Sequence, residues 1–255
     1  MSHIRLRVVR SLKTRVTGVY FFGGIMKFSS PFRDLSLFEL GLWLMSTLVI
    51  TLSFLIPREK DILTLIASLI GVTALIFVAK GYVLGQVLTV IFAVFYGIIS
   101  VIFGYYGEMI TYLFMTAPVA VMAVISWLRH PFKGEKEVEV SVMSKKQILF
   151  MWFMTAAVTF VFYFILGALG NANLAVSTLS VTTSFLASSL TFFRSPFYAL
   201  AYAANDVVLI ILWGLASFDS ISYLPMVLCF VMFLANDLYG FYNWERMKRR
   251  QRNNS

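Results

Sequence analysis

Few residues in this sequence can carry covalent, metal or acid–base chemistry. Among 255 residues there is one cysteine and there are two histidines. The single cysteine, Cys229, excludes an intramolecular disulfide framework and a cysteine-rich metal site. His3 and His130 lie far apart and form no ligand cluster. A Gly-x-Ser-x-Gly motif, a histidine beside a nucleophile and a phosphate-binding glycine loop are also missing. The sequence therefore predicts no catalysis, no metal site and no cofactor.

Charge is also scarce. Only 13% of the residues are charged and 60% are hydrophobic, whereas ordinary soluble domains are about a quarter charged. The mean hydropathy is +0.84. One soluble core cannot bury this many apolar side chains, so the lipid bilayer must be part of the solvent. The composition predicts an all-α integral membrane protein.

Long apolar runs follow one another along the chain. Because about 20 apolar residues span a bilayer, we predict eight transmembrane helices, with ends marked by glycine, proline or polar residues. The predicted spans cover residues 35–56, 62–79, 82–103, 109–128, 148–169, 174–193, 197–217 and 223–242. Residues 1–34 form a basic segment, in which 16–27 is predicted to be an interfacial helix. No cleavage site of the A-x-A kind follows it, so we expect it to be retained.

The basic residues indicate how these spans are oriented. With eight spans and a cytoplasmic amino terminus, 19 of the 21 lysines and arginines face the cytoplasm, and only Arg58 and Lys60 face outside. The loop 129–147 and the basic tail 243–255 are then both cytoplasmic. A basic tail can also indicate nucleic-acid binding, but the sequence has no soluble domain to present one. We predict a multi-pass protein of the cell membrane with both termini inside and no nucleic-acid partner.

A weak internal repeat is also present. Tyr-Leu-Phe-Met at 112–115 matches Tyr-Leu-Pro-Met at 223–226, which superimposes spans two to four on spans six to eight. This predicts two parallel three-helix repeats, 62–128 and 174–242, joined by a connector span, 148–169, with 35–56 as an additional span. Parallel repeats of this kind occur in transporters, which hold their substrate between the repeats near the midplane.

Polar side chains inside the spans share particular helix faces. In the seventh span Tyr202, Asn205 and Trp213 lie on one face, with Asp206 beside it. We expect these faces to converge on one wet, aromatic-walled cavity. The candidate substrate-binding residues are Asn205, Asp206, Tyr202, Trp213, Gln86, Tyr96, Thr183, Asn236 and Asp237. Asp206 is the strongest candidate, because a carboxylate at mid-membrane costs a few kcal/mol and normally faces a pathway or a partner.

Each of these signals has a structural alternative. The hydroxyl stripe around Thr183 could serve helix packing, and Gln86 could be solvated at the cytoplasmic end. Trp43, Tyr242 and Trp244 are expected to be interface anchors. An acid–base pair of Asp206 and Asp237 would suggest a membrane enzyme, but Asp237 lies further towards the cytoplasm, which argues against contact. A proton-coupled carrier using Asp206 is a further alternative.

Two stretches resemble the PnuC family of bacterial vitamin B3 transporters. They are "RSPFYALAYAANDVVLIILWGLAS" (194–217) and "LANDLYGFYNWERMKRRQ" (234–251), and "FYGIISVIFGYYGEM" (95–109) and "SWLRHPF" (126–132) are similar to its first repeat. The resemblance covers roughly residues 61 to 247. It departs at 121–130, "VMAVISWLRH", which is apolar where members carry an Asn-x-Tyr-Gly stretch. The resemblance implies a full-length SWEET-like core of three plus one plus three helices, assembled as a homotrimer.

The resemblance also implies a function. The family carries nicotinamide riboside by facilitated diffusion, and a cytoplasmic kinase traps the vitamin by phosphorylation. Relatives are linked to other vitamins such as thiamine, so a different vitamin or a deoxynucleoside stays an alternative. For a riboside, Asn205 is expected to bond the ribose hydroxyls, and Trp213 or Tyr202 to stack near the nicotinamide. Tyr96 could supply a further ring face, and Asp206 could offset the positive charge or orient Asn205.

Overall fold

The computed structural model describes residues 30–57, 61–102, 106–171 and 173–254. Two units are distinguished, residues 1–36 and 37–255. In the first unit the described part contains a short 3-10 turn, Pro31–Asp34. The predicted interfacial helix at 16–27 lies outside the described residues, as do Arg58 and Lys60.

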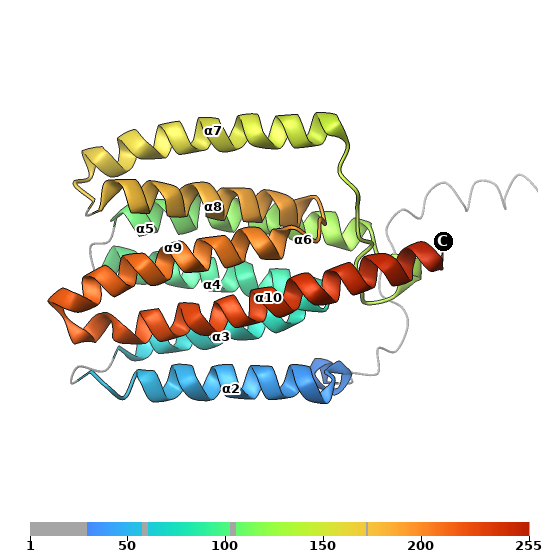
Figure 1. Cartoon of the computed structure of the whole chain (residues 1–255), viewed down its shortest axis with the longest axis horizontal. Helices are drawn as coiled ribbons and strands as arrows, with labels where there is room; N and C mark the ends of the chain where they lie inside the picture. Colours follow the sequence, from blue (N-terminus) through green and yellow to red (C-terminus); the bar gives the residue numbers. More distant parts are fainter. Residues whose placement is uncertain (1–29, 58–60, 103–105, 172, 255) are drawn as a thin grey trace, which may run out of the picture. The chain divides into compact units, whose positions relative to one another are not determined.

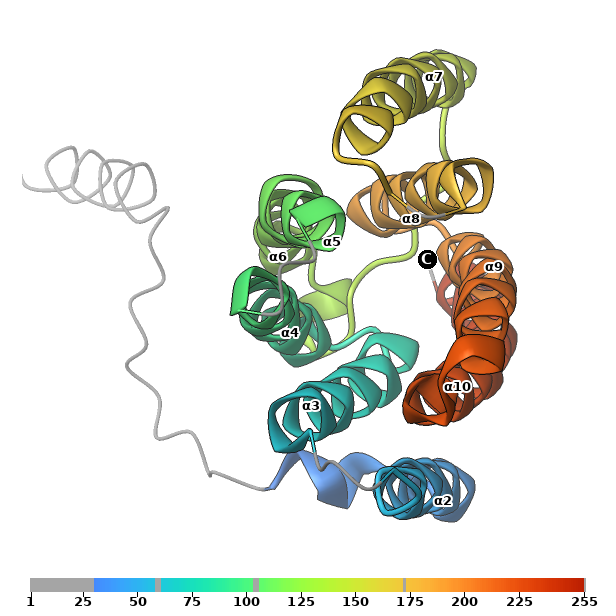
Figure 2. The same cartoon turned by 90° about the vertical axis from the view of Figure 1, so that its left-hand side faces the viewer.

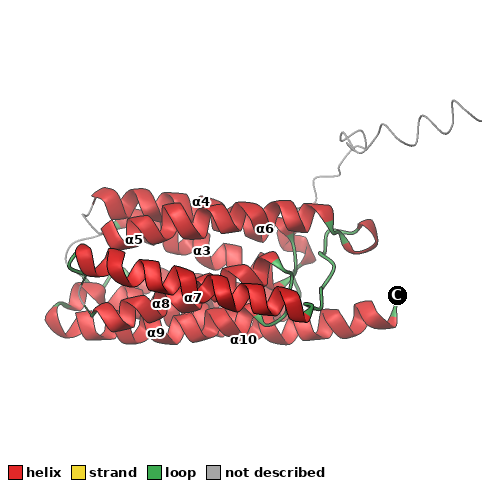
Figure 3. Cartoon of the chain, turned by 90° about the horizontal axis from the view of Figure 1, so that it is seen from above, coloured by secondary structure: helices red, strands yellow, loops and turns green. Residues whose placement is uncertain are grey.

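The second unit is built from helices. Within the described residues they are α2 (Leu37–Ser53), α3 (Ile62–Ala79), α4 (Val83–Ile102), α5 (Tyr106–Ile110), the π-helical η2 (Thr111–Thr116), α6 (Ala117–Arg129), the 3-10 turn η3 (Phe132–Gly134), α7 (Lys145–Ala168), α8 (Leu174–Phe192), α9 (Tyr198–Asp219), the 3-10 turn η4 (Ile221–Tyr223) and α10 (Leu224–Asn253). The all-helical fold predicted from the sequence is confirmed for this part of the chain, whose loops are short compared with the helices (Figure 3).

Local sequence signals explain where several helices begin. Ser144 caps α7 in a capping box with Gln147, and the Asp61 side chain accepts a hydrogen bond from the Thr64 amide at the start of α3. A proline in the first turn of α10 costs little there, because the amide that it lacks would have no partner within the helix. In α6 the proline follows directly on the π-helical η2. The predicted fourth span is continuous through α5, η2 and α6, with its π turn in the middle.

Seven helical segments in the described residues are long and apolar enough to cross a membrane. They correspond to predicted spans two to eight. At the place of the predicted first span the structure has α2, an apolar helix of 17 residues that is shorter than the other seven. At 1.5 Å per residue α2 is about 26 Å long, slightly short of the roughly 30 Å hydrocarbon core.

Six of these segments form a ring, which Figure 2 shows along its axis. Within it α3 packs on α4, α4 on α6, α6 on α8, α8 on α9 and α9 on α10, and α10 closes the ring against α3. Two helices lie outside the ring: α7 packs against α8, and α2 packs against α3 and α10. The outward side of α7 is apolar and exposed, with Leu149 73% and Phe153 68% accessible. Such a face is stable only against lipid or another apolar surface.

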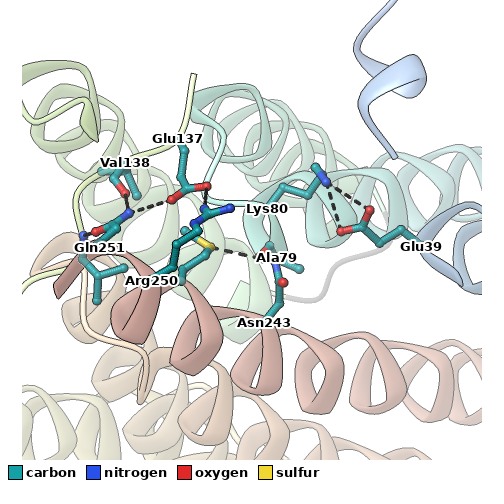
Figure 4. Close-up of polar contacts among 10 residues, drawn as sticks. Glu39, Ala79, Lys80, Glu137, Val138, Asn243, Arg250 and Gln251 are labelled. Carbon is teal, nitrogen blue, oxygen red and sulfur yellow. Dashed lines mark hydrogen bonds and ion pairs between the residues drawn. The ribbon is translucent and has the colours of Figure 1, made fainter. Parts of the chain in front are cut away.

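One end of the bundle, called here the basic end, contains Lys80, Arg129, Arg194 and the last turns of α10 (Figure 1). Residues 130–144 cross this end and are fixed by polar contacts (Figure 4). Glu137 pairs with Arg250 and accepts a hydrogen bond from Gln251 at 2.7 Å. Glu39 of α2 forms a partly buried ion pair with Lys80 at 3.0 Å and also accepts a bond from Tyr239. These contacts hold α2, α10 and the loop together at the basic end.

Two tryptophan side chains at the same end each donate a hydrogen bond to a backbone carbonyl of another helix. The Nε1 of Trp127 on α6 donates to the Thr191 carbonyl near the end of α8, at 3.0 Å. The Nε1 of Trp244 on α10 donates to the Val78 carbonyl near the end of α3, at 2.9 Å. Both rings are fully buried and their centroids are 5.4 Å apart. We call these two hydrogen bonds the tryptophan latch. Trp244 is therefore a buried helix-to-helix contact, and the prediction that it is an interface anchor was wrong.

Candidate functional site

A cavity of about 530 Å³ lies inside the ring and extends towards the end opposite the basic end. It is called here the large cavity. Its walls come from α4, α5, η2, α7, α8, α9, η4 and α10. They include Tyr96, Glu108, Tyr112, Ser180, Ser184, Asn205, Trp213, Asp219 and Tyr223. A second space of about 90 Å³, the narrow cavity, continues towards the basic end and is lined by Gln86, Tyr112, Ser184, Tyr202, Asn205, Asp206 and Asp237 among others. The large cavity has the volume of a small-molecule site.

Asn205 lies where the two cavities meet, because it lines both of them. Its Oδ1 accepts hydrogen bonds from Thr183 Oγ1 at 2.9 Å and Ser180 Oγ at 3.2 Å, both on α8. No acceptor in the described part of the chain bonds its Nδ2. The two α8 hydroxyls therefore fix the orientation of the amide and leave its nitrogen available to donate to a ligand.

Asp206 and Asp237 lie together at the inner part of the narrow cavity. Their side chains are only 3% and 4% exposed, and the two carboxyl groups are within hydrogen-bonding reach of each other. This contradicts the expectation that the two carboxyls are too far apart along the membrane to touch. Asp206 Oδ2 is buried, and no amide, alcohol or basic group of the described residues donates a hydrogen bond to it. The narrow cavity is lined by no lysine, arginine or histidine within the described residues.

Three other predicted residues also line these spaces. Trp213 and Tyr96 are in the wall of the large cavity, and Tyr202 lines the narrow cavity with its hydroxyl 3.0 Å from Ser188 Oγ. Gln86 lines the narrow cavity too and is 3% exposed, so the alternative that it is merely solvated was wrong.

Two predicted residues are placed differently. Thr183 does not line either cavity; it supports Asn205 from behind and keeps bonds to carbonyls of its own helix. Asn236 points away, since its Nδ2 donates to Ser46 of α2 at 2.9 Å and to the Met232 carbonyl at 2.7 Å. The structure brings Asn205, Asp206 and Asp237 together, but not Asn236.

The structure adds residues that sequence reasoning missed. Tyr112 lines both cavities, with its ring 4.6 Å from that of Tyr96, and Tyr223 lies 5.6 Å from Trp213. Glu108 lines the large cavity, and its carboxyl group is within hydrogen-bonding reach of the Tyr96 hydroxyl. Tyr112 and Tyr223 were visible in the sequence as the matching Tyr-Leu repeat motifs. Glu108 gave no signal, because it precedes the apolar part of its span and looks like an ordinary loop residue.

A ring of membrane-length helices around a polar cavity, with apolar outer faces, defines a multi-pass membrane transporter. Comparison with known proteins agrees. Residues 61–246 match the family described as "Nicotinamide mononucleotide transporter". The chain therefore belongs to the nicotinamide mononucleotide transporter family, which confirms the resemblance seen in the sequence and the expectation that it is not an enzyme.

Three relatives illustrate the similarity. The nicotinamide riboside transporter PnuC of Neisseria mucosa is 27% identical over 215 residues, which are 82% of each chain. The PnuC transporter of Haemophilus influenzae is 22% identical over 210 residues, 82% of this chain and 90% of that protein. A crystal structure of the vitamin B3 transporter PnuC superimposes with a TM-score of 0.72 at 26% identity, covering 85% of this chain and 94% of that one.

Proposed function

We propose that this protein carries nicotinamide riboside across the bacterial cell membrane by facilitated diffusion, and that a cytoplasmic kinase traps the vitamin by phosphorylation. The observation that supports this most is the large cavity, where an oriented amide donor, Asn205, lies among the rings of Tyr96, Tyr112, Trp213 and Tyr223. Its curated relatives are named for the same substrate.

The chemistry of the riboside matches this lining. Its ribose hydroxyls need donors and acceptors, which Asn205 and the α8 serines offer. Its pyridinium ring is a flat cation, which aromatic faces and carboxylates attract. The described lining of the large cavity contains no basic residue that would repel a cation. A phosphate group would need basic partners or free amides, so the unphosphorylated riboside fits better than the mononucleotide.

We further propose eight spans, both termini in the cytoplasm, and a SWEET-like core of three plus one plus three helices. The tryptophan latch supports two related halves, since the third helix of each half bonds the end of the first helix of the other. The accepting residues, Val78 and Thr191, are 113 positions apart. Gly81 and Arg194, the left-handed residues that end α3 and α8, have the same separation (81 to 194).

The loop at the basic end donates a backbone hydrogen bond to each of the two proposed halves. Its Val138 amide donates to the Gly81 carbonyl at 2.9 Å, and its Ser141 amide donates to the Arg194 carbonyl at 3.0 Å. Equivalent positions of both halves thus receive equivalent bonds, as a repeat related by an axis along the membrane normal requires. The basic residues at this end favour a cytoplasmic location under the positive-inside rule.

A homotrimer is proposed on the family resemblance, with each protomer holding its own pathway. The exposed apolar face of α7 is compatible with either lipid or a neighbouring protomer. Thiamine and deoxynucleosides are alternative substrates.

A proton-coupled carrier is the second candidate, favoured by the contact between Asp206 and Asp237. Two ionised carboxylates within hydrogen-bonding reach repel each other, whereas two carboxyl groups that share one proton attract each other. A substrate cation arriving beside them could change the protonation of the pair.

Uptake into proteoliposomes tests these proposals. Purified protein should take up labelled nicotinamide riboside to equilibrium without ATP, and excess unlabelled riboside should compete while thiamine and deoxyuridine should not. A proton ionophore should leave the initial rate unchanged under an imposed pH gradient. An initial uptake rate that falls strongly with the ionophore would favour the proton-coupled carrier. Competition by thiamine and not by unlabelled riboside would show that the substrate is thiamine.

A further inference from the structure

Glu108 is a carboxylate in the wall of the large cavity that the proposed function has not yet used. It lies on the short helix α5 and is only partly accessible. It also lines an adjoining space of about 640 Å³, bounded by α2, α3, α4, α9 and the start of α10. Glu108, Tyr96, Trp213 and Tyr223 all line both spaces. The carboxylate thus lies in a wall that it shares with three aromatic side chains.

Among the described residues, no basic side chain lines the spaces beside Glu108. Neither space is lined by a lysine, arginine or histidine within the described residues. The Tyr96 hydroxyl is within hydrogen-bonding reach of the carboxylate, and a bond donated by it would favour the ionised form. A partly buried carboxylate attracts a cation more strongly than an exposed one, because water screens it less.

We propose that Glu108 selects ligands by their positive charge, acting as counter-ion to a flat aromatic cation held between the Tyr96–Tyr112 and Trp213–Tyr223 ring pairs. The ring centroids within these pairs are 4.6 Å and 5.6 Å apart and the rings are tilted by 52° and 40°, so each pair offers two ring faces at an angle to each other. Ring faces and a carboxylate favour the same ligand, because both interact with positive charge. This inference rests on the proposed function and identifies Glu108 as the residue that distinguishes ligands by the charge of the pyridinium ring.

Asp219 provides a matched control. It is a second carboxylate in the wall of the large cavity, but it is exposed at the end of α9. Removing its charge changes the net charge of the cavity by the same amount as removing that of Glu108. If only the total field of the cavity mattered, the two substitutions would have equal effects; if Glu108 contacts the cation, its effect is larger.

The experiment compares two ligands that differ in charge. Nicotinamide riboside is a cation, and its reduced dihydro form has the same ribose and carboxamide without the positive charge. Isothermal titration of the purified transporter should show that Glu108→Gln weakens binding of the cation about tenfold or more. Binding of the neutral form should change less than about twofold. Glu108→Asp should retain most of the affinity for the cation, and Asp219→Asn should weaken binding of the cation clearly less than Glu108→Gln does.

Each other result has a defined meaning. If Glu108→Gln lowers the affinity for both ligands equally, or leaves both affinities unchanged, the inference is overturned. Glu108 would then not distinguish ligands by their charge. An equal effect of Asp219→Asn would overturn it too, in favour of the general field. Wild-type protein that binds neither ligand would instead refute the proposed function itself, which distinguishes the two failures.

Discussion

The amide of Asn205 offers the sharpest test of the site, since its two ends have different roles. Its oxygen is held by Ser180 and Thr183, and its nitrogen faces the junction of the cavities without a partner in the described residues. Asn205→Ala removes the nitrogen that we expect to donate to a ribose hydroxyl. The loss of a buried hydrogen bond to a ligand costs about 1–3 kcal/mol, which is roughly ten- to a hundredfold in affinity.

The same substitution should disturb the fold very little. Thr183 keeps two acceptors after the amide is gone, the carbonyls of Leu179 at 3.0 Å and Ser180 at 3.1 Å. Only the Ser180 hydroxyl loses a partner, and it lines the large cavity, where water can replace the amide. We therefore expect a stability loss of about 1 kcal/mol or less and normal insertion.

Isothermal titration with nicotinamide riboside measures the effect, and Thr183→Val is the control. That variant removes one bond that orients the amide but leaves the donating nitrogen, so its loss should stay below about fivefold. If Asn205→Ala binds as tightly as the wild type, the amide serves helix packing alone. If Thr183→Val loses as much affinity as Asn205→Ala, orientation is the whole effect and no donated bond need be invoked.

Three further predictions concern topology, assembly and the latch. In a Cys229→Ala background, a cysteine at Asp219 should react with an impermeant reagent from outside, while one at Lys136 should not; external labelling at Lys136 would refute the orientation. Light scattering in detergent should give three times the protomer mass, and an active monomer would remove the trimer. Trp244→Phe keeps the ring but loses the bond to the Val78 carbonyl, so it should lower stability by about 1 kcal/mol; an unchanged melting temperature would show the bond contributes nothing.

The sequence was most informative about features that depend on the residues of a single helix. Apolar run length predicted the positions of the seven membrane-length helices, and helical spacing predicted that Tyr202, Asn205 and Trp213 belong to one polar face. These properties depend on residues three or four apart in the same helix, which is the range over which spacing fixes geometry.

Contacts between helices were harder to predict, because they depend on where each helix begins. Asp237 was expected to lie towards the cytoplasm, since its span was predicted to end at residue 242. The helix α10 continues to Asn253, which moves Asp237 to the middle of the helix. Asp206 is 13 residues from the end of α9 (206 to 219), and Asp237 is 13 residues from the start of α10 (224 to 237). In two antiparallel helices joined by a short turn, these positions are at equal depth.

Asn236 and Glu108 show the other limit of the sequence. Asn236 was assigned to the cavity because it is polar and adjacent to Asp237, but neighbours in a helix point about 100° apart, and Asn236 faces Ser46 of the additional helix α2. Glu108 was overlooked because acidic residues at span ends are normally solvated. In the structure it belongs to the short helix α5, at the start of the fourth span, and α5 contributes to the wall of the large cavity.

The bonds across the basic end set an energetic bias on the transport cycle. To open the pathway at that end, the two halves must release both tryptophan bonds and the two backbone bonds from Val138 and Ser141. At about 1 kcal/mol net for each bond, opening costs roughly 4 kcal/mol, or about a thousandfold in population. With the basic end in the cytoplasm, as proposed, an empty carrier would keep its large cavity open to the outside medium, and its turnover would depend on how much of that cost the bound substrate offsets.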